Sequence, residues 1–454
     1  MTTATTTPPS RAAGGRLAHV DALRGFALLG ILIVNIGYLA SAYHGTGVED
    51  PGFTSPLDNA VRWFVAVFFE AKFFLLFSFL FGYSFTLQLA SAERHGARFA
   101  SRFLRRLAGL FVLGALHAVL LFPGDILTTY AVLGLILPAA RHLRPRTAVY
   151  TAAALFALTA AAYAVLALSA HAAGGSGVDP ATAAGAERAT EALRGGPVSV
   201  VAAHLEQLPD VLMLLLFFQA PAALAAFLLG LAAGKSQTLG DIARHRRTLG
   251  RLQWAGFTLG LLGGVVYAHA NLEHPGSPYQ ILAMGIDVVT APLLAAAYAA
   301  TVLKLARGRH ADRLIALLAP AGRMTLTNYL AQSLVCALLF TGYGAALVGD
   351  VPPLGVLAIA LVLFTTQAAA SRWWLRRHHY GPLEWLLRAW TTLTRPPLRL
   401  SAAHNRTPRP GPLSPRRGAR RSPRIRCRTC GRRRRRRRPC AACPSTSRRP
   451  SSSC

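Results

Sequence analysis

The chain has 454 residues, of which 53% are hydrophobic and only 15% are charged, and its mean hydropathy is +0.37. A soluble globular protein carries about 25% charged residues, so this chain has too little polar surface to cover a water-soluble body of its size. The net charge of +31 does not indicate a specific nucleic-acid partner, because residues 401–454 hold 18 Arg and no Lys, Asp or Glu, which leaves +13 (31 − 18) elsewhere. The composition predicts an all-α integral membrane protein whose partner is the lipid bilayer.

Apolar segments of about 20 residues, the length that spans a bilayer as a helix, recur between residues 17 and 392. They predict a polytopic domain of about ten transmembrane helices, of which the fourth is short. A long extracytoplasmic loop, 171–210, follows the fifth span, and its stretch from Val198 to Gln207 is weakly amphipathic. The predicted spans are 24–41, 63–91, 103–122, 126–140, 147–170, 211–234, 252–270, 281–303, 324–346 and 353–371.

The loops between these spans alternate between rich and poor in Lys and Arg. Cytoplasmic loops carry the excess of these residues, so the alternation predicts that both termini are cytoplasmic. The opposite set of loops is nearly bare, apart from Arg188 and Arg194 in the long loop. The basic set contains Arg94, Arg98, Arg102, Arg105 and Arg106, then Arg141, Arg144 and Arg146, then Lys235, Arg244, Arg246, Arg247 and Arg251, then Lys304, Arg307, Arg309 and Arg313.

The two ends of the chain differ from the membrane domain. Residues 1–16 lack an apolar pattern and are predicted to be disordered. Trp and Arg interleave over 373–392, which predicts a helix at the cytoplasmic membrane surface. A disordered tail rich in Arg, Pro and Cys is predicted over 393–454, and its composition also resembles an out-of-frame reading of GC-rich DNA.

The tail contains two Cys pairs with the spacing of a zinc site, Cys427-x-x-Cys430 and Cys440-x-x-Cys443. The nine residues between the pairs are fewer than usual and include the run from Arg432 to Arg438. Seven adjacent cations would repel one another and the metal, so no metal site is predicted.

Polar side chains within the predicted spans are the candidate catalytic residues, because ionisable groups are costly in a bilayer. Given the predicted orientation, they fall at a similar depth toward the extracytoplasmic side, where a carboxylate and a histidine could perform acid–base chemistry. Each could instead hold neighbouring helices together or cap a helix. The candidates are Asn35, Glu70, Lys72, His117 and Asp125.

A second polar group enters the ninth predicted span from the cytoplasmic side. Its hydroxyl, amide and phenol groups lie along one or two helix faces, where they could line a cavity or bind the head of a cofactor. Hydrogen bonds between helices are the alternative. The group contains Arg323, Thr325, Asn328, Tyr329 and Gln332.

Several long motifs together resemble the YeiB-like family, bacterial membrane proteins that carry domain of unknown function 418. They run in the family's order from about residue 17 to 392. The resemblance implies a multi-pass protein of the bacterial cytoplasmic, or inner, membrane. The matching residues are Asp21 to Gly30 with Asn35; Glu70-Ala-Lys72-Phe73; Leu76 to Gly82; His117; Gly124 to Leu127 with Tyr130; Gly322 to Tyr329; and Tyr380 to Trp385 with Arg388.

This family is similar to the transmembrane acyltransferases, namely acyltransferase family 3 and the lysosomal heparan N-acetyltransferase type. In family 3, an Arg on the first helix is followed, after ten residues, by a His that is thought to be catalytic. Here Arg24 is followed, after ten residues, by Asn35, so the base is missing at that position. The heparan-type enzymes resemble this chain in having Asn there and place their His further on. His44 is a loose match to that His.

Two functions follow as alternatives. In the first, the chain is a membrane O- or N-acyltransferase, with acyl-CoA as a donor from the cytoplasm and a glycan or another envelope molecule as the acceptor. His117 or His44 would then act as the base, oriented by Glu70 or Asp125. No permanently bound cofactor is expected. In the second, the chain is a small-solute or proton-coupled transporter, and the intramembrane ionisable residues mark its path.

Overall fold

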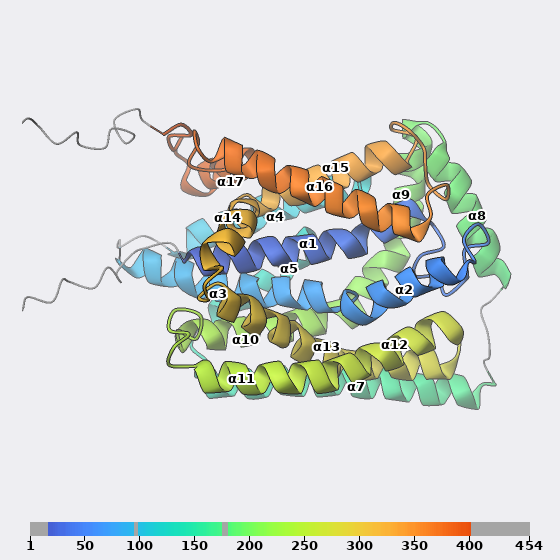
Figure 1. The fold of residues 1–454 in the computed structure, drawn as a ribbon, viewed down its shortest axis with the longest axis horizontal. Helices are drawn as coiled ribbons and strands as arrows, with labels where there is room; N and C mark the ends of the chain where they lie inside the picture. Colours follow the sequence, from blue (N-terminus) through green and yellow to red (C-terminus); the bar gives the residue numbers. More distant parts are fainter. Residues whose placement is uncertain (1–16, 95–98, 175–179, 401–454) are drawn as a thin grey trace, which may run out of the picture. The chain divides into compact units, whose positions relative to one another are not determined.

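The computed structural model describes residues 17–94, 99–174 and 180–400. The predicted disordered segment 1–16, the paired cysteines and the Arg run lie outside these residues. Figure 1 shows a bundle of helices with roughly parallel axes. The helices are α1 (Ala18–Ala40), α2 (Pro56–Phe68), α3 (Lys72–Arg94), α4 (Phe99–Leu120), α5 (Ile126–Gly134), α6 (Leu137–Ala140), α7 (Pro145–Ala172), α8 (Pro180–Arg194), α9 (Pro197–Leu214), η1 (Leu215–Gln219), α10 (Ala220–Lys235), α11 (Arg246–Ala255), η2 (Gly256–Gly260), α12 (Leu261–Glu273), α13 (Pro278–Leu305), α14 (Ala311–Arg323), α15 (Thr325–Phe340), α16 (Pro353–Trp374) and α17 (Pro382–Thr392).

The all-α fold class is confirmed for the described residues, whose one β-contact is an isolated bridge between His378 and Arg399. Seven helical segments there are long and apolar enough to cross a membrane, while α15 is apolar but shorter. This identifies a multi-pass membrane protein. The seven segments are α1, α2 with α3, α4, α7, α9 with α10, α13 and α16.

Two of the predicted segments have a different form. The fourth predicted span is divided into α5 and α6, and α5 covers only about 14 Å at 1.5 Å per residue. The long loop 171–210 is largely helical, because α8 and α9 occupy most of it. Helix α9 then runs through the π-helical turn η1 into α10. The helical segment that contains the sixth predicted span therefore begins at Pro197 rather than near residue 211.

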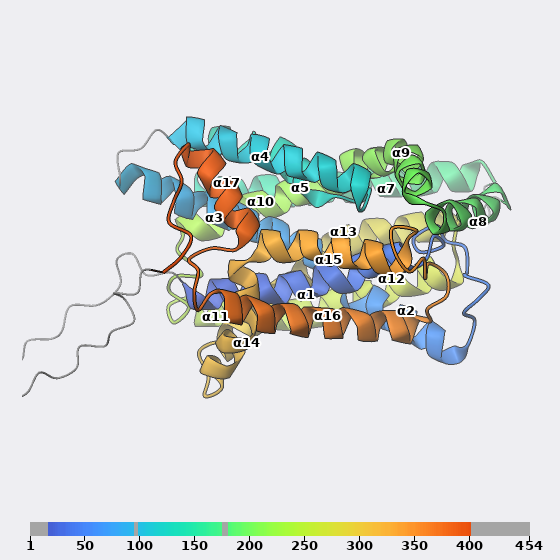
Figure 2. The same ribbon diagram turned by 90° about the horizontal axis from the view of Figure 1, so that it is seen from above.

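Helix α1 lies at the centre of the bundle, where it packs against α3, α13, α14, α15 and α16 (Figures 1 and 2). Small residues allow two of the closest helix approaches. A Cβ on Gly25 would lie 2.1 Å from the carbonyl oxygen of Leu318, and a Cβ on Gly322 would lie 1.8 Å from that of Asp21. Helices α1 and α14 can therefore meet only because both positions are glycine, as is common where membrane helices cross.

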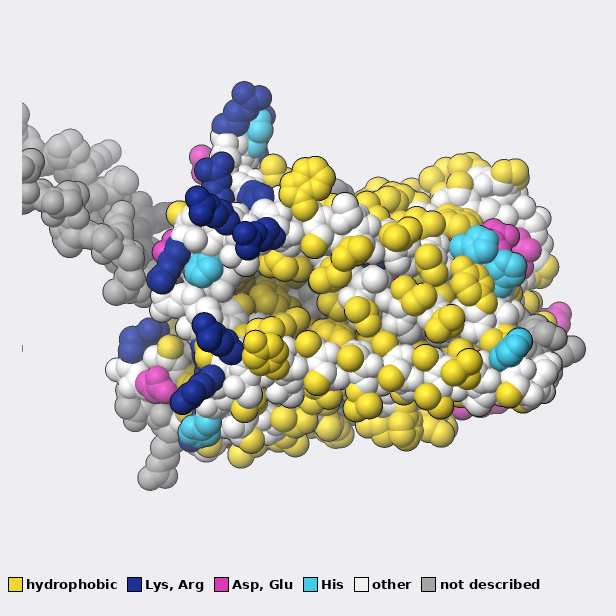
Figure 3. Space-filling view, turned by 90° about the horizontal axis from the view of Figure 1, so that it is seen from below, with side chains coloured by type: hydrophobic (Ala, Val, Ile, Leu, Met, Phe, Trp, Pro, Cys, Tyr) yellow, Lys and Arg dark blue, Asp and Glu magenta, His cyan; other side chains and the backbone are white. Residues whose placement is uncertain are grey.

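One end of the bundle carries most of the cations, and we call it the basic end. Arg94 lies at the end of α3, Arg144 precedes α7, Arg246 begins α11 and Lys304 lies in the last turn of α13. On the face shown in Figure 3, Lys and Arg gather at this end, and hydrophobic side chains cover most of the middle. The loops that are rich in Lys and Arg in the sequence therefore lie at one end of the bundle.

The chain after α16 folds back onto the basic end. The predicted interfacial helix 373–392 consists of the last turn of α16, a turn and α17. Helix α17 packs along α4, where Trp390 Nε1 donates to the Arg105 carbonyl oxygen at 2.8 Å and Arg105 Nε donates to that of Thr391 at 2.9 Å. Residues 393–400, the start of the predicted tail, run beside 377–379, with the Leu400 amide donating to the Arg377 carbonyl at 2.9 Å.

Candidate functional site

Two of the predicted catalytic residues, His117 and Asp125, form a buried pair. Asp125 caps α5, because its Oδ2 accepts hydrogen bonds from the backbone amide of Thr128, at 2.7 Å, and from the Thr128 hydroxyl. Its Oδ1 lies 2.9 Å from Nδ1 of His117, which is three residues before the end of α4. Both side chains are 0% exposed. A carboxylate in this position accepts the Nδ1 proton, which leaves Nε2 as the basic atom of the ring.

Nε2 of His117 is buried and has no hydrogen-bond partner among the described residues. The imidazole packs against the buried ring of Tyr329 from α15, with a centroid distance of 5.1 Å. A buried polar atom without a partner is unusual in a folded protein, and it is a common feature of catalytic and ligand-binding sites. In this arrangement Nε2 of His117 could accept a proton from a bound molecule, as a general base does.

His204 on α9 lies in the same region and was missed by the sequence analysis. Its ring is buried, and Nδ1 donates to the carbonyl oxygen of Val119 at 3.1 Å. It is also close enough to His117 for the two rings to interact electrostatically. His204 falls in the weakly amphipathic stretch of the predicted loop 171–210, because the following helix begins at Pro197 and not near residue 211.

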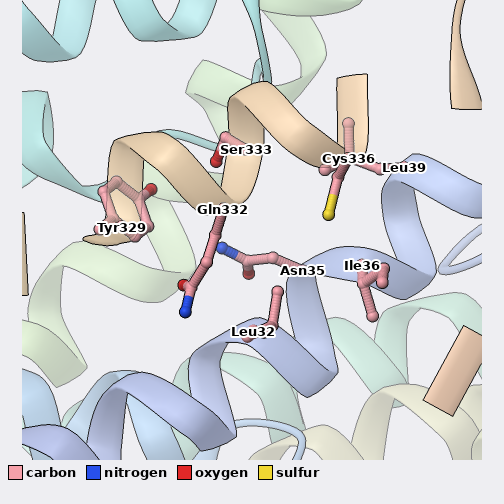
Figure 4. Close-up of a pocket in the computed structure, with 8 residues that line it drawn as sticks. All are labelled: Leu32, Asn35, Ile36, Leu39, Tyr329, Gln332, Ser333 and Cys336. Atoms are coloured by element: carbon pink, nitrogen blue, oxygen red, sulfur yellow. The ribbon is translucent and has the colours of Figure 1, made fainter. Parts of the chain in front are cut away.

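Asn35 lines a small cavity between α1 and α15. The volume is about 10 Å³, which is close to the room that one water molecule needs. Figure 4 shows the side chains of the two helices facing each other, with Asn35 beside Gln332 and with Tyr329 at one side. Tyr329 therefore contacts both the cavity and His117. The full lining is Leu32, Asn35, Ile36, Leu39, Tyr329, Gln332, Ser333 and Cys336.

Lys72 forms a second buried ion pair with Asp287 of α13, a residue that the sequence analysis did not select. The Lys72 Nζ is 3.2 Å from Asp287 Oδ1 and donates to the carbonyl oxygen of Ala66 at 3.2 Å. The two side chains are 0% and 4% exposed. Asp287 is nine residues from the start of α13 and eighteen from its end, about 13 and 27 Å along the axis, so the pair lies in the half remote from the basic end.

This ion pair depends on a break between α2 and α3 that the sequence did not predict. Helix α2 ends at Phe68, α3 begins at Lys72, and Ala71 has a φ of 61°. This left-handed conformation is costly for a residue with a Cβ. The break exposes the carbonyl of Ala66 to the Lys72 ammonium and gives Glu70 and Lys72 separate surroundings, whereas a continuous helix would have kept them on one span.

Glu70 binds a different set of partners from Lys72. The hydroxyl of Tyr267 on α12 donates to Glu70 Oε2 at 2.8 Å, and His44 Nε2 lies 3.7 Å from Oε1. Lys72 Nζ is 5.2 Å from the centroid of the same Tyr267 ring. We name Glu70, Lys72, Asp287, Tyr267 and His44 the break cluster. His44, a loose match to a catalytic histidine in sequence, is thus placed beside a carboxylate.

The predicted cofactor-binding residues mostly bond to neighbouring helices. Asn328 Nδ2 donates to Ser371 Oγ at 2.9 Å, and Gln332 Nε2 donates to Gln367 Oε1 at 2.9 Å. We call these four side chains, which are all buried, the α15–α16 network. Thr325 Oγ1 donates to the carbonyl of Gly322 at 2.7 Å, and Arg323 ends α14.

Helix α17 fixes the start of α15 through Glu384. Glu384 Oε1 accepts from the amides of Leu326 and Thr327 at 2.7 and 3.1 Å, and Oε2 accepts from the Thr327 hydroxyl at 2.6 Å. A carboxylate at a helix N-terminus both satisfies free amides and matches the helix dipole. Residues before and after the last long helix are therefore joined at the basic end.

In the described ranges no group of three or more His, Cys, Asp or Glu is arranged to hold a metal ion. The buried ionisable groups described above are a His–Asp pair, an ammonium–carboxylate pair, and a further carboxylate beside a histidine.

These features define a multi-pass α-helical membrane protein with buried ionisable sites. A family model described as "Protein of unknown function (DUF418)" matches residues 233–394. The chain is 32% identical over 400 residues to the uncharacterized protein YxaH of Bacillus subtilis (strain 168), a match that covers 84% of this chain and 96% of that protein. It therefore belongs to the YeiB-like DUF418 family, as its motifs indicated.

Two further relatives support this assignment. An uncharacterized 39.9 kDa protein of Bacillus acidopullulyticus is 30% identical, over 83% of this chain and 94% of its own length. The uncharacterized protein YeiB of Escherichia coli (strain K12) is 27% identical, over 84% of this chain and 96% of its own length. No solved structure matches the chain. The names of these relatives state no activity, so function must be argued from the site.

Proposed function

We propose that the chain is an acyltransferase of the bacterial cytoplasmic membrane. In this proposal about ten segments cross the bilayer and both termini are cytoplasmic, so the basic end faces the cytoplasm and the half that contains His117 and Asp125 faces outward. The gathering of Lys and Arg at one end supports this orientation. The acceptor is a glycan or another envelope molecule, and the donor is an acyl-CoA.

One observation carries the proposal: the buried His117–Asp125 pair with Nε2 of His117 left without a partner among the described residues. Asp125 keeps the proton on Nδ1, so Nε2 can take the proton of an acceptor hydroxyl or amine. The acceptor atom then bonds to the acyl carbon, the C–S bond of the thioester breaks, and His117 returns the proton to the leaving thiolate. Acyl transfer needs no metal in this scheme.

Fewer residues remain as candidates for binding the acyl-CoA donor than the sequence suggested. Asn328 and Gln332 are engaged with α16, so we assign them to the helix interface and retain Arg323 and the basic end as the side from which the donor approaches. The cavity beside Tyr329 has room for about one water molecule. An acyl group that reaches His117 from this side must therefore displace side chains between α1 and α15.

The first test measures acyl-CoA binding and turnover by the detergent-purified full-length protein. Calorimetry with acetyl-CoA and a longer acyl-CoA should show saturable binding that Arg323→Ala weakens. His117→Gln should retain this binding and lose slow thioester hydrolysis, because it removes the base without removing the donor site. If neither acyl-CoA binds, the acyltransferase proposal fails.

A small-solute or proton-coupled transporter is the second candidate, and one observation favours it. A long apolar helical segment is broken inside the bundle at a buried ion pair, Lys72 with Asp287. Broken helices with charged groups at the break commonly form the substrate sites of transporters. Proteoliposomes tested for proton and solute flux, with Asp287→Asn as the variant, distinguish this function, since flux without acyl-CoA binding supports the transporter and no flux excludes it.

A further inference from the structure

The break cluster holds two buried carboxylates but only one permanent cation. Lys72 lies 3.2 Å from Asp287 and balances it. Among the described residues, Glu70 has one ion-pair partner, the ring of His44 at 3.7 Å. With Glu70 ionised and His44 neutral, the cluster carries one uncompensated negative charge. Such a charge is strongly unfavourable away from water, so it must be balanced.

Two tyrosine side chains also face this site. Tyr267 from α12 donates a hydrogen bond to Glu70 but is neutral. Tyr38 from α1 interacts electrostatically with Glu70. The Tyr38 ring packs edge-on against the His44 ring, with centroids 4.4 Å apart. A phenol carries no positive charge, so neither side chain can compensate Glu70.

Arg62 of α2 is the other nearby cation, and its charge is already balanced. Its Nη1 lies 3.8 Å from Glu49 Oε1, and its Nη2 donates to the carbonyl of Phe53 at 2.7 Å. Arg62 acts electrostatically on His44 rather than pairing with Glu70. Burial lowers the pKa of His44, Glu70 raises it, and Arg62 lowers it again. One proton bound by the Glu70 carboxylate or by the His44 ring would balance the remaining negative charge.

We propose that Glu70 and His44 together hold one exchangeable proton, which reaches them from the end of the bundle opposite the basic end. His44 lies in the loop between α1 and α2, and its side chain is 26% exposed, whereas that of Glu70 is 11% exposed. His44 therefore connects the buried carboxylate to the aqueous side. The inference follows from the charges around the helix break and does not depend on acyl transfer.

The test measures proton uptake by the purified full-length protein as the pH is lowered, together with its infrared difference spectrum. The wild type should take up one more proton than Glu70→Gln over the range in which the shared proton binds. The spectrum should show a protonated-carboxyl or imidazolium signal that Glu70→Gln removes. Glu70→Asp should restore the uptake. His44→Gln should shift the pH midpoint of the uptake, because the carboxylate remains and only the imidazole beside it is lost.

Two controls make the outcome decisive. Glu273→Gln, which removes a carboxylate at the exposed end of α12, should leave the extra proton unchanged. Thermal unfolding of every variant identifies any that is misfolded. If Glu70→Gln is misfolded, the midpoint of uptake in His44→Gln becomes the test, and an unchanged midpoint overturns the proposal. Equal proton uptake in wild type and folded Glu70→Gln overturns the proposal. Binding of labelled Na⁺ in place of the proton also overturns it and makes the site a sodium site.

Discussion

The α15–α16 network and the His117–Asp125 pair are both buried polar groups inside a helical bundle. They differ in whether a hydrogen-bonding atom is left without a partner. In the network, amides and a hydroxyl from two facing helices bond to one another, at 2.9 Å for the two shortest contacts. In the His–Asp pair, one ring nitrogen of a titratable group has no partner among the described residues. The first arrangement can hold helices together, and the second can also accept a proton.

This difference gives a criterion that residue type alone does not. Asn328 and His117 were both candidate site residues in the sequence, since both are polar side chains within predicted spans. Their surroundings separate them: Asn328 is hydrogen-bonded to Ser371 and to the carbonyl of Ala321, whereas His117 is bonded on one side only. The comparison therefore predicts catalytic loss at one place and a modest loss of stability at the other.

The largest effect is expected at His117. His117→Gln should reduce acyl transfer by about 10²–10⁴-fold, the usual contribution of a general base, while the protein stays folded. Asp125→Asn should cause a smaller loss in turnover, because the base survives but its tautomer is no longer fixed. Steady-state turnover with labelled acyl-CoA measures both variants, and unchanged turnover in folded His117→Gln would place the chemistry elsewhere.

Lys72 should give the largest effect on stability. Lys72→Met removes the ammonium and leaves Asp287 buried without its partner, which should cost about 3–5 kcal/mol in the free energy of unfolding. The double variant Lys72→Met/Asp287→Leu should recover most of this loss, since no charge then remains buried. Denaturant unfolding in detergent measures the cycle. Additive losses in the double variant would show that the two residues do not act as a pair.

The α15–α16 network should respond more weakly. Gln332→Leu removes one interhelical hydrogen bond and should lower the free energy of unfolding by about 1 kcal/mol, because such bonds contribute modestly inside membranes. Turnover should change less than twofold. A loss of turnover comparable with that of His117→Gln, in a protein of nearly normal stability, would return Gln332 to the functional site.

The smallest effect is expected at the exposed pair of Arg194 and Asp350. Their nitrogen and oxygen are 2.6 Å apart, but the side chains are 43% and 52% exposed. Asp350→Asn should therefore change the free energy of unfolding by about 0–1 kcal/mol and leave turnover unaltered. This variant serves as the baseline for the other variants, and a large effect would show that α8 and the loop before α16 contribute to function.

Sequence patterns identified the fold class and the long apolar helices. They also selected His117 and Asp125 among five candidates, because intramembrane ionisable groups are rare enough to stand out, but they did not show that these two residues are paired. The same rule would have selected Asp287, the acidic residue of the eighth predicted span, had it been applied to every span. His204 was missed because the helix that carries it begins earlier than its apolar part. The grouping of Asn35 with Tyr329 depends on which helices meet, and spacing along one chain does not contain that information.

The break at Ala71 is the feature that sequence reasoning could least have found. Alanine strongly favours the helix, and the surrounding Phe residues read as one continuous span. The positive φ at Ala71 arises only from the tertiary setting, in which Lys72 meets Asp287 and Glu70 meets Tyr267. Local preference is overridden there by buried charge pairing.

The most direct test of the central claim compares His117→Gln with Gln332→Leu in one acyl-transfer assay. Membranes from a deletion strain that expresses either variant or the wild type receive acetyl-CoA labelled in the acyl group, and label in the envelope fraction is measured. The account predicts transfer by the wild type and by Gln332→Leu, and loss of transfer by His117→Gln. Loss with Gln332→Leu and full transfer with His117→Gln, in folded proteins, would contradict it.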